Sequence, residues 1–354
     1  MNRINKLKRI IRDQDIDYFL INSPNNIYYI TGFYPTTEAY LLYSRDGGFI
    51  LYVTDIDYQD SKNREDSFTV DKTPLELTIS DYVKSKLENI RGKVHLEYTF
   101  LTHFYFNKFF AGNKELEFFS GDKIISDMRQ VKDRNELELI YKSISITERG
   151  IMTAYNAINE GKTEIELAAE AEYAMRRSGA EGFAFDSLIV SGKRTSWPHA
   201  KSTENSLRKG DLVIVDLGCK YKGYCSDMTR TFTVGEADDT QKKIYGLVKK
   251  AQELAVEEIR AGVQADTVDL TARNFFREEG YGEYFIHSLG HGVGLDVHEA
   301  PSISFRNHDA VKEGNVFTVE PGLYIPGWGG IRIEDMIIVE KRGARLITNL
   351  PKMI

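Results

Sequence analysis

The pattern of apolar and polar positions divides the chain into two regions. Residues 2–14 repeat apolar side chains at helical spacing, which predicts a basic amphipathic helix. Short apolar runs at 17–22, 39–43 and 49–53 predict strands, and strands then alternate with helices to about residue 120. This alternation predicts a small α/β domain over residues 1–126.

Residues 127–354 follow a different pattern. The polar segment Asp127–Asn135 is interpreted as a linker between the two regions. A long amphipathic helix follows it and ends before Gly161. The next helix begins at Thr163–Glu166, which matches a capping box, and it ends at Gly179. Apolar strands come after these two helices.

The same order of elements then recurs in outline. Helices over 241–260 and about 265–279 precede strands that carry His291, Glu320 and Glu334. Two helices followed by strands with polar side chains, occurring twice, predict an α+β domain with pseudo-twofold organisation. The functional site is expected between its two halves.

Two carboxylates belong to an apolar hairpin in the first half of this domain. Leu212–Val215 predicts a buried strand that ends at Asp216, Gly218–Gly223 predicts a turn, and Tyr224–Val234 predicts the return strand with Asp227. Hairpin partners lie side by side, so Asp216 is expected close to Asp227. A buried charge needs a partner or a metal ion, although a strand-end aspartate bonded to turn amides is an alternative.

The segment Phe285–Pro301 holds three of the seven histidines, His287, His291 and His298. His287 and His291 have the spacing of a helical zinc pair, but the glycines between and after them disfavour a helix. These glycines instead predict an irregular loop or bulged strand. A lone histidine is usually structural, whereas three in a glycine-rich segment favour a functional site.

Two further strands carry acidic side chains. Glu320 ends an apolar strand, and Arg332 and Glu334 share one face of the last apolar strand, which favours a lined cavity. Four carboxylates and one histidine on separate apolar strands indicate a shared cation, and this ligand set suits divalent manganese, cobalt, iron or zinc. Because four carboxylates exceed the needs of one ion, two bridged ions are expected.

Composition excludes several classes of function. The net charge of −7 and the lack of a long basic run disfavour nucleic acid and anionic membranes as partners. No apolar stretch approaches the length of a membrane span, and no secretory core follows the basic start. A cytoplasmic location is therefore expected, with Cys219 and Cys225 as free thiols.

These motifs resemble the pita-bread metallopeptidases: Xaa-Pro dipeptidase (prolidase), aminopeptidase P and methionine aminopeptidase. The resemblance covers about residues 126–354, and the two-domain layout is similar to the prolidase and aminopeptidase P branch. It implies a catalytic pita-bread domain over 127–354. It also implies a creatinase/prolidase-like domain over 1–126 that shapes substrate access and dimerisation, and hence a homodimer.

The resemblance implies a role for each metal-ligand candidate. Asp216 would bind one ion, Asp227 and Glu334 would bridge both ions, and His291 and Glu320 would complete the other. The two divalent ions would be manganese in the first instance, with cobalt, zinc or iron as alternatives. Glu320 would also act as general base and proton shuttle for a bridging water.

The resemblance also implies contacts with a substrate. His298 would stabilise the tetrahedral intermediate, His199 would bind the substrate near the reacting bond, and His287 would border the proline-binding region. His199 and His298 are thus catalytic candidates together with Glu320. Arg332 would lie beside the metal ligands, and it is a substrate-binding candidate together with Tyr324.

Three aromatic residues are candidates for the pocket that receives the proline ring. They are Tyr324, Trp197 and Trp328. The resemblance also implies that Thr229 supports Asp227.

The function implied is hydrolysis of the Xaa-Pro bond at the N-terminus of dipeptides or short peptides. A proline nitrogen has no N–H for a protease to grip, whereas a dinuclear site can act on the carbonyl directly. The alternatives are an aminopeptidase P that accepts longer Xaa-Pro peptides and a non-catalytic peptide-binding module on the same fold. Five intact ligand positions argue against the module. The choice between prolidase and aminopeptidase P, the native metal, the oligomeric state and the preferred N-terminal residue stay open at this point.

Overall fold

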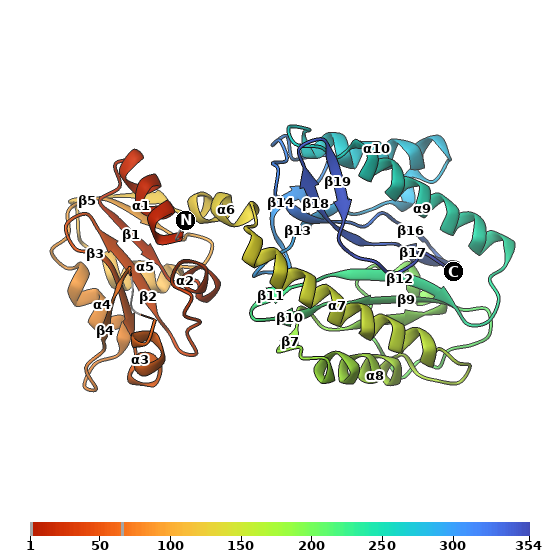
Figure 1. The fold of residues 1–354 in the computed structure, drawn as a ribbon, viewed down its shortest axis with the longest axis horizontal. Helices are drawn as coiled ribbons and strands as arrows, with labels where there is room; N and C mark the ends of the chain where they lie inside the picture. The colour runs from red at the N-terminus through yellow and green to blue at the C-terminus, as the bar shows by residue number, and fades with distance from the viewer. Residues whose placement is uncertain (1–2, 65–66) are drawn as a thin grey trace. The chain divides into compact units, whose positions relative to one another are not determined.

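The chain forms two compact units that divide after Met128 (Figure 1). The computed structural model describes residues 3–64 and 67–354. No helix within these two ranges combines the length and the apolar character that a membrane crossing requires.

The first unit is built on a six-stranded mixed sheet with the order β4-β3-β2-β1-β5-β6. The pairs β1–β2 and β2–β3 are antiparallel, and the other three pairs are parallel. Its strands are β1 (Tyr18–Ile21), β2 (Tyr40–Ser44), β3 (Gly48–Val53), β4 (Thr69–Lys72), β5 (Gly92–Leu96) and β6 (Leu116–Ser120). Its helices are α1 (Arg3–Asp13), α2 (Pro24–Thr31), α3 (Asp55–Lys62), α4 (Ile79–Leu87) and α5 (His103–Phe110). The predicted alternation of strands and helices is confirmed.

The second unit contains two pairs of long helices. In Figure 1, α7 and α8 lie along one side of its strands, and α9 and α10 lie along the other. The helices are α7 (Arg134–Ala157), α8 (Glu164–Arg177), α9 (Asp239–Glu258) and α10 (Ala265–Glu278), with short 3-10 turns η1 (Gly192–Ser196) and η2 (Gly282–Tyr284). The capping box predicted at Thr163 is present. The Thr163 side chain accepts a hydrogen bond from the Glu166 N–H, and the Glu166 side chain accepts one from the Thr163 N–H.

The strands of this unit form four small sheets, with orders β12-β9-β8, β11-β10-β7, β14-β13-β15-β18-β19 and β16-β17. The strands of the first half are β7 (Gly182–Phe183), β8 (Leu188–Ser191), β9 (Leu212–Leu217), β10 (Cys219–Tyr221), β11 (Tyr224–Cys225) and β12 (Met228–Thr233). Those of the second half are β13 (Gly290–Gly292), β14 (Glu299–Ile303), β15 (Val316–Val319), β16 (Gly322–Ile325), β17 (Gly329–Arg332), β18 (Asp335–Glu340) and β19 (Gly343–Leu346). The two-fold repetition of helices and then strands agrees with the sequence pattern.

The core of the second half joins α9 and α10 to the strands behind them. Val248, Phe276, Phe317 and Ile337 are fully buried members of this cluster. Apolar burial of this kind is the main stabilising contribution to a domain of this size. It holds β13, β15 and β17 in fixed positions, and these strands present the candidate site.

The segment Asp127–Asn135 does contain the boundary between the two units, after Met128, but it is not the solvated linker that its polar composition suggested. The helix α6 (Asp122–Gln130) continues into this segment, and α7 begins at Arg134. The side chains of Arg129 and Lys132 are buried, because they form ion pairs with acidic residues that come far later in the chain. The amino-acid composition of a segment does not reveal ion pairs with residues distant in sequence. The charged residues of this segment therefore suggested an exposed linker.

The hairpin that carries the two aspartates is more elaborate than predicted. Asp216 in β9 lies directly opposite Thr229 in β12, and Asp227 comes just before β12 begins. The strands β10 and β11 form a second small hairpin between them, with its turn at Lys222 and Gly223, both at positive φ. The two carboxylates therefore reach the same region, although Asp216 and Asp227 are not directly opposite each other in the strand pairing.

Candidate metal centre

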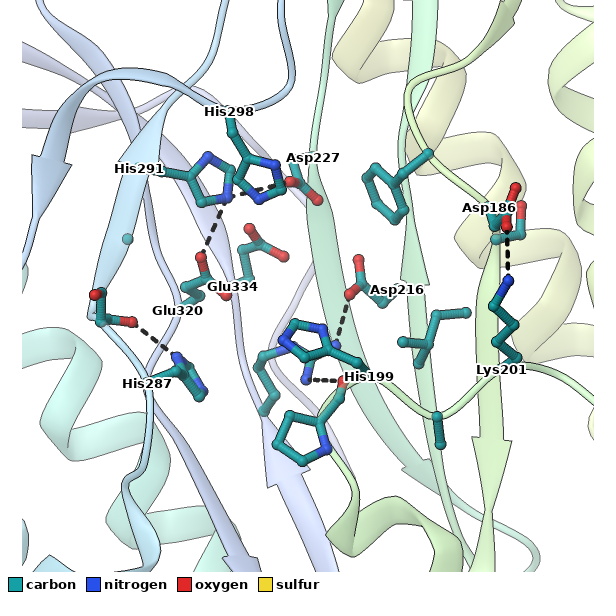
Figure 2. Close-up of a pocket in the computed structure, with 18 of the residues that line it drawn as sticks. Asp186, His199, Lys201, Asp216, Asp227, His287, His291, His298, Glu320 and Glu334 are labelled. Carbon is teal, nitrogen blue, oxygen red and sulfur yellow. Dashed lines mark hydrogen bonds and ion pairs between the residues drawn. The ribbon is translucent and has the colours of Figure 1, made fainter. Parts of the chain in front are cut away.

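The five ligand candidates line one pocket of about 670 Å³ (Figure 2). Each comes from a different part of the two halves: Asp216 from β9, Asp227 from just before β12, His291 from β13, Glu320 from just after β15 and Glu334 from the link between β17 and β18. The fold thus brings together all five residues that the sequence singled out.

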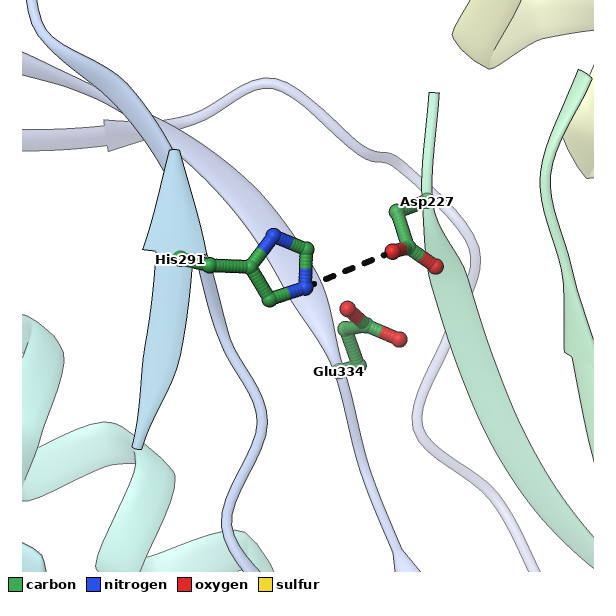
Figure 3. A group of neighbouring side chains, drawn as sticks. All are labelled: Asp227, His291 and Glu334. Atoms are coloured by element: carbon green, nitrogen blue, oxygen red, sulfur yellow. Dashed lines mark ion pairs between the residues drawn. The ribbon is translucent and has the colours of Figure 1, made fainter. Parts of the chain in front are cut away.

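Three of these side chains form a tight group (Figure 3). Ligand atoms of Asp227, His291 and Glu334 all lie within 4.8 Å of one another. The Nε2 atom of His291 is 3.6 Å from Asp227 Oδ2 and 3.3 Å from Glu320 Oε1. Such spacing between donor atoms is compatible with a shared cation.

Close backbone packing fixes the position of His291. A Cβ atom at Gly290 would lie 1.9 Å from the Thr318 carbonyl oxygen, and one at Gly292 would lie 2.3 Å from the Ala300 carbonyl oxygen. The register of β13 against β14 shifts between His291 and Gly292, which is a bulge. The predicted bulged, glycine-rich strand is confirmed, and only glycine fits between its two neighbours.

Hydrogen bonds orient three of the carboxylates. Asp216 Oδ2 accepts from Arg332 Nη2 at 2.6 Å, and Glu334 Oε2 accepts from Thr229 Oγ1 at 2.7 Å. Thr318 Oγ1 donates to Glu320 Oε1 at 3.1 Å. The expectation that Thr229 supports Asp227 is wrong, because the staggered register turns Thr229 toward Glu334.

Two buried carboxylate oxygens have no hydrogen-bond partner among the residues that the structure describes. They are Asp216 Oδ1 and Glu334 Oε1. In each case the second oxygen of the same group is engaged, so the free oxygen has a fixed direction. Buried polar atoms are rarely left unsatisfied, and a cation is the natural partner for a carboxylate oxygen.

The electrostatics of the group also favour the binding of cations. Burial and the nearby Glu334 and Asp216 carboxylates raise the pKa of Asp227 well above its usual value. Burial and the Glu320 and Asp216 carboxylates do the same to the pKa of Glu334. Burial opposes ionisation of Glu320 as well, but the hydrogen bond and charge of His291 outweigh it and lower the Glu320 pKa to about 2. Crowded carboxylates of this kind can all ionise only beside cations.

The geometry and the donor set therefore fit divalent metal ions. Four carboxylates and one imidazole are ligands that manganese, iron, cobalt and zinc accept. The sequence pattern of metallopeptidase family M24 matches residues 138–341, which is more than half of the chain.

This chain belongs to metallopeptidase family M24. Residues 3–131 of the M24 chain also match the creatinase/prolidase N-terminal domain. It is 39% identical to the Xaa-Pro dipeptidase of Pyrococcus furiosus over 98% of this chain and 97% of that protein. Its fold superimposes on the prolidase from Pyrococcus horikoshii OT3 with a TM-score of 0.92, at 39% identity and 99% coverage of both chains. The X-Pro aminopeptidase from Thermotoga maritima is similar at 37% identity, with a TM-score of 0.88 and 99% coverage of both chains. The predicted pita-bread fold with a creatinase/prolidase-like N-terminal domain is confirmed.

Three further histidines of this M24 chain, His199, His287 and His298, line the pocket of the metal-ligand candidates. The rings of His291 and His298 have centroids 4.0 Å apart, and His199 also lines the pocket. Burial lowers the pKa of His298, so its imidazole is neutral at neutral pH and can donate one N–H. His199 and His298 therefore border the space beside the carboxylates.

His287 belongs to a directional chain of hydrogen bonds. Its Nδ1 is 2.8 Å from the Ser288 carbonyl oxygen, which only accepts, so Nδ1 donates and Nε2 accepts. The Tyr324 hydroxyl lies 3.0 Å from that Nε2 and donates to it, since burial raises the Tyr324 pKa to about 12. Arg332 Nη1 in turn donates to the Tyr324 oxygen at 2.8 Å. Both ring nitrogens of His287 are thus occupied.

Sequence reasoning placed some lining residues incorrectly and overlooked others. Tyr324 lines the pocket, but Trp197 and Trp328 are not among its lining residues. Asp186 and Lys201 were not predicted, yet they line the pocket as an ion pair with Nζ and Oδ2 3.4 Å apart (Figure 2). The position of Lys201 two residues after His199 was a signal available in the sequence.

Proposed function

We propose that this protein is a dinuclear metal-dependent peptidase that hydrolyses the Xaa-Pro bond at the N-terminus of dipeptides or short peptides. The observation that carries the proposal is the convergence of four carboxylates and one histidine on one pocket. Full-length similarity to Xaa-Pro dipeptidases supports the choice of substrate.

The five candidates divide between two ions in this proposal. Asp216 would hold one ion, His291 and Glu320 would hold the other, and Asp227 and Glu334 would contribute to both. The support for bridging is that Asp227 and Glu334 have the strongly raised pKa values, which proximity to two cations would restore. The free oxygens of Asp216 and Glu334 support the same division.

Bound divalent ions would polarise the carbonyl of the Xaa residue in the Xaa-Pro bond and lower the pKa of the attacking water. Glu320 takes the proton of that water and passes it to the proline nitrogen as the peptide bond breaks. The lowered pKa of Glu320 keeps its carboxylate ionised at neutral pH, which is the state in which it can accept a proton. His298 and His199 donate N–H groups to the carbonyl oxygen as it gains negative charge.

The other lining residues form the wall for the proline ring. Tyr324 and His287 contribute ring surface, since the hydroxyl and both imidazole nitrogens already have partners. Arg332 keeps that wall and Asp216 in one fixed arrangement, because it donates to both Tyr324 and Asp216. In this proposal the rings of Tyr324 and His287 contact the substrate, and His199 and His298 polarise its carbonyl group.

Three further properties belong to the proposal. Manganese is the native metal, with cobalt, zinc and iron as competitors that elemental analysis of the purified protein would detect. The N-terminal unit shapes substrate access. It also forms a homodimer, and light scattering on the purified protein would test this oligomeric state. The protein is cytoplasmic; two buried free thiols, Cys219 and Cys225, support a reducing compartment, and cell fractionation would test this.

A second activity has support of its own. The X-Pro aminopeptidase from Thermotoga maritima matches the whole chain nearly as well as the prolidases do. Acceptance of residues beyond the proline is therefore the alternative to a strict dipeptidase. A peptide-binding module without activity is the third possibility, and the complete ligand set argues against it.

The test is hydrolysis of an Xaa-Pro dipeptide and an Xaa-Pro-Yaa tripeptide by the manganese-supplemented protein, with the chelator-treated protein as control. Cleavage restricted to the dipeptide supports a prolidase, and efficient cleavage of the tripeptide supports an aminopeptidase P. Cleavage of neither peptide by protein with two bound ions would refute the proposed activity.

A further inference from the structure

His199 reaches the pocket from a loop, whereas the five metal-ligand candidates lie in strands or directly beside them (Figure 2). We call residues 192–205 the His199 loop; it begins with the 3-10 turn η1 and lies between β8 and β9. A hydrogen-bond donor lowers a reaction barrier only when it is held where charge develops on the substrate. The contribution of His199 therefore depends on the contacts that fix this loop.

One buried carboxylate holds the two ends of the His199 loop together. Glu164 is the first residue of α8 and is 0% exposed. Its Oε1 accepts from the backbone N–H and the hydroxyl of Ser191 at 2.8 and 2.9 Å. Its Oε2 accepts from the backbone N–H and the hydroxyl of Thr203, both at 2.9 Å. Because Ser191 directly precedes the loop and Thr203 lies near its end, both ends are fixed to α8.

Arg194 extends this arrangement from Glu164 to the backbone beside His199. Its Nη1 donates to Glu164 Oε2, and its Nη2 donates to the Lys201 carbonyl oxygen at 2.8 Å. The guanidinium can make both bonds at once because its N–H groups form a rigid fork. Lys201 comes two residues after His199, so this bond acts on the backbone close to the imidazole.

The contact on the other side of His199 is longer. Arg332 Nη1 donates to the Pro198 carbonyl oxygen at 3.4 Å, which is at the long end for a hydrogen bond. The shorter bond from Arg194 to Lys201 therefore restrains the loop more strongly than the bond from Arg332 does.

The role of Arg194 can be separated from the stability of the fold. Without Arg194, the Glu164 carboxylate still accepts from Ser191 and Thr203, and its place in the first turn of α8 favours a negative charge. The Arg194 side chain is itself 24% exposed. Replacement of Arg194 should therefore leave the ends of the loop in place and release only the backbone next to His199.

We propose that Arg194, held by Glu164, is a positioning residue for His199. It fixes the loop so that the His199 N–H meets the carbonyl oxygen of the Xaa-Pro bond. The inference rests on the proposed function, which gives His199 its role in the reaction. Arg194 and Glu164 are not among the residues that line the pocket, so they act through His199 and not on the substrate.

The kinetic test uses Arg194→Met in the manganese-supplemented full chain with an Xaa-Pro dipeptide. We expect kcat to fall by about tenfold, because a displaced donor stabilises the developing charge less well. KM and metal content should stay near the wild-type values. Arg194→Lys should recover part of the loss, since an ammonium can pair with Glu164 but lacks the rigid fork.

A double variant distinguishes positioning from a general structural effect. If Arg194 acts through His199, then His199→Ala and His199→Ala/Arg194→Met should have the same kcat, because no imidazole remains to be positioned. The inference is overturned if Arg194→Met keeps the wild-type kcat, or if it slows the His199→Ala protein as much as it slows the wild type.

Lys162→Met is the matched control. Lys162 directly precedes the N-cap of α8 and pairs with Glu170, and its side chain is 25% exposed, close to the value for Arg194. The substitution removes one positive charge and one ion pair at the same end of α8 without a contact to the His199 loop. Its kcat should equal that of the wild type, and a loss equal to that of Arg194→Met would overturn the inference.

A second readout does not depend on catalysis. In NMR spectra of the full chain with isotope-labelled histidine, the His199 signal is identified by its absence from His199→Ala. Arg194→Met should shift or broaden this signal and leave that of His95, in the first unit, unchanged. An unchanged His199 signal would overturn the inference. If the metal-loaded wild type cleaves no Xaa-Pro peptide, the proposed function fails, and the NMR comparison still decides whether Arg194 positions His199.

Discussion

The buried ion pairs at the start of α7 give the sharpest stability prediction. Lys132 Nζ lies 2.6 Å from Glu299 Oε1, and the two side chains are 1% and 8% exposed. Arg129 also donates to Glu299, and its second partner is Asp296 at 2.7 Å. The perturbation is Glu299→Gln, which removes the negative charge and keeps the shape.

The magnitude follows from burial. Removal of one partner from a buried pair destabilises a protein by roughly 3–5 kcal/mol, because the other charge stays buried without compensation. Glutamine still accepts hydrogen bonds and Arg129 keeps Asp296, so we expect the low end, about 3 kcal/mol. Lys132→Met in the Glu299→Gln background should recover part of that loss, since both charges are then gone.

The effect should also depend on pH with a defined sign. Burial opposes ionisation of Glu299, but Lys132 and Arg129 outweigh it and lower the Glu299 pKa below its usual 4.5. A lowered pKa contributes stability that is present above the unfolded value and lost as pH falls through the folded value. The difference in the free energy of unfolding between wild type and Glu299→Gln should therefore be constant from neutral pH down to about 5 and shrink below about 4.5.

The assay is urea unfolding of metal-free protein followed by tryptophan fluorescence. Trp197 and Trp328 are the only tryptophans in the sequence, and both belong to the second unit, so the signal reports on that unit. Metal is removed because bound ions would add their own stabilisation. The control is Glu138→Gln, since the Arg134–Glu138 pair is 91% and 61% exposed and should change stability by less than about 0.5 kcal/mol. Equal losses in the two variants would refute the reasoning.

Three other predictions concern the metal centre. Asp227→Asn should reduce bound metal below two tightly held ions, and elemental analysis that still finds two would rule out a bridging Asp227. His298→Ala should keep both ions but lower kcat by about 100-fold or more, and an unchanged rate would remove His298 from the mechanism. Gly290→Ala should lower the free energy of unfolding by about 2 kcal/mol, because its Cβ would lie 1.9 Å from the Thr318 carbonyl oxygen, and wild-type stability in the urea assay would show that β13 can shift.

The features that the sequence predicted well all have a local signature. The capping box at Thr163 needs only four residues, and acidic residues at the ends of apolar strands, such as Asp216 and Glu320, are conspicuous because isolated buried charges are unfavourable. The glycines beside His291 likewise indicated that the backbone makes close contacts there. Such patterns were sufficient for the fold and for the gathering of the five ligand candidates.

The features that escaped prediction depend on partners distant in sequence. Lys132 and Glu299 are separated by 167 residues, so nothing near Lys132 shows that its charge is buried. The partner of Thr229 is Glu334, 105 residues away, and only the strand register reveals it. The occupied nitrogens of His287 depend on the Tyr324 hydroxyl, which is 37 residues away.

The pairing of Arg332 with Asp216 sets the sign of the charge that a ligand meets. Four carboxylates and one guanidinium leave the group with three net negative charges when all are ionised and the imidazoles are neutral. A single divalent ion would leave one negative charge, and a second would reverse the sign to one positive charge. Only the doubly loaded protein would then attract an anion, so a second ion would control the access of negatively charged ligands.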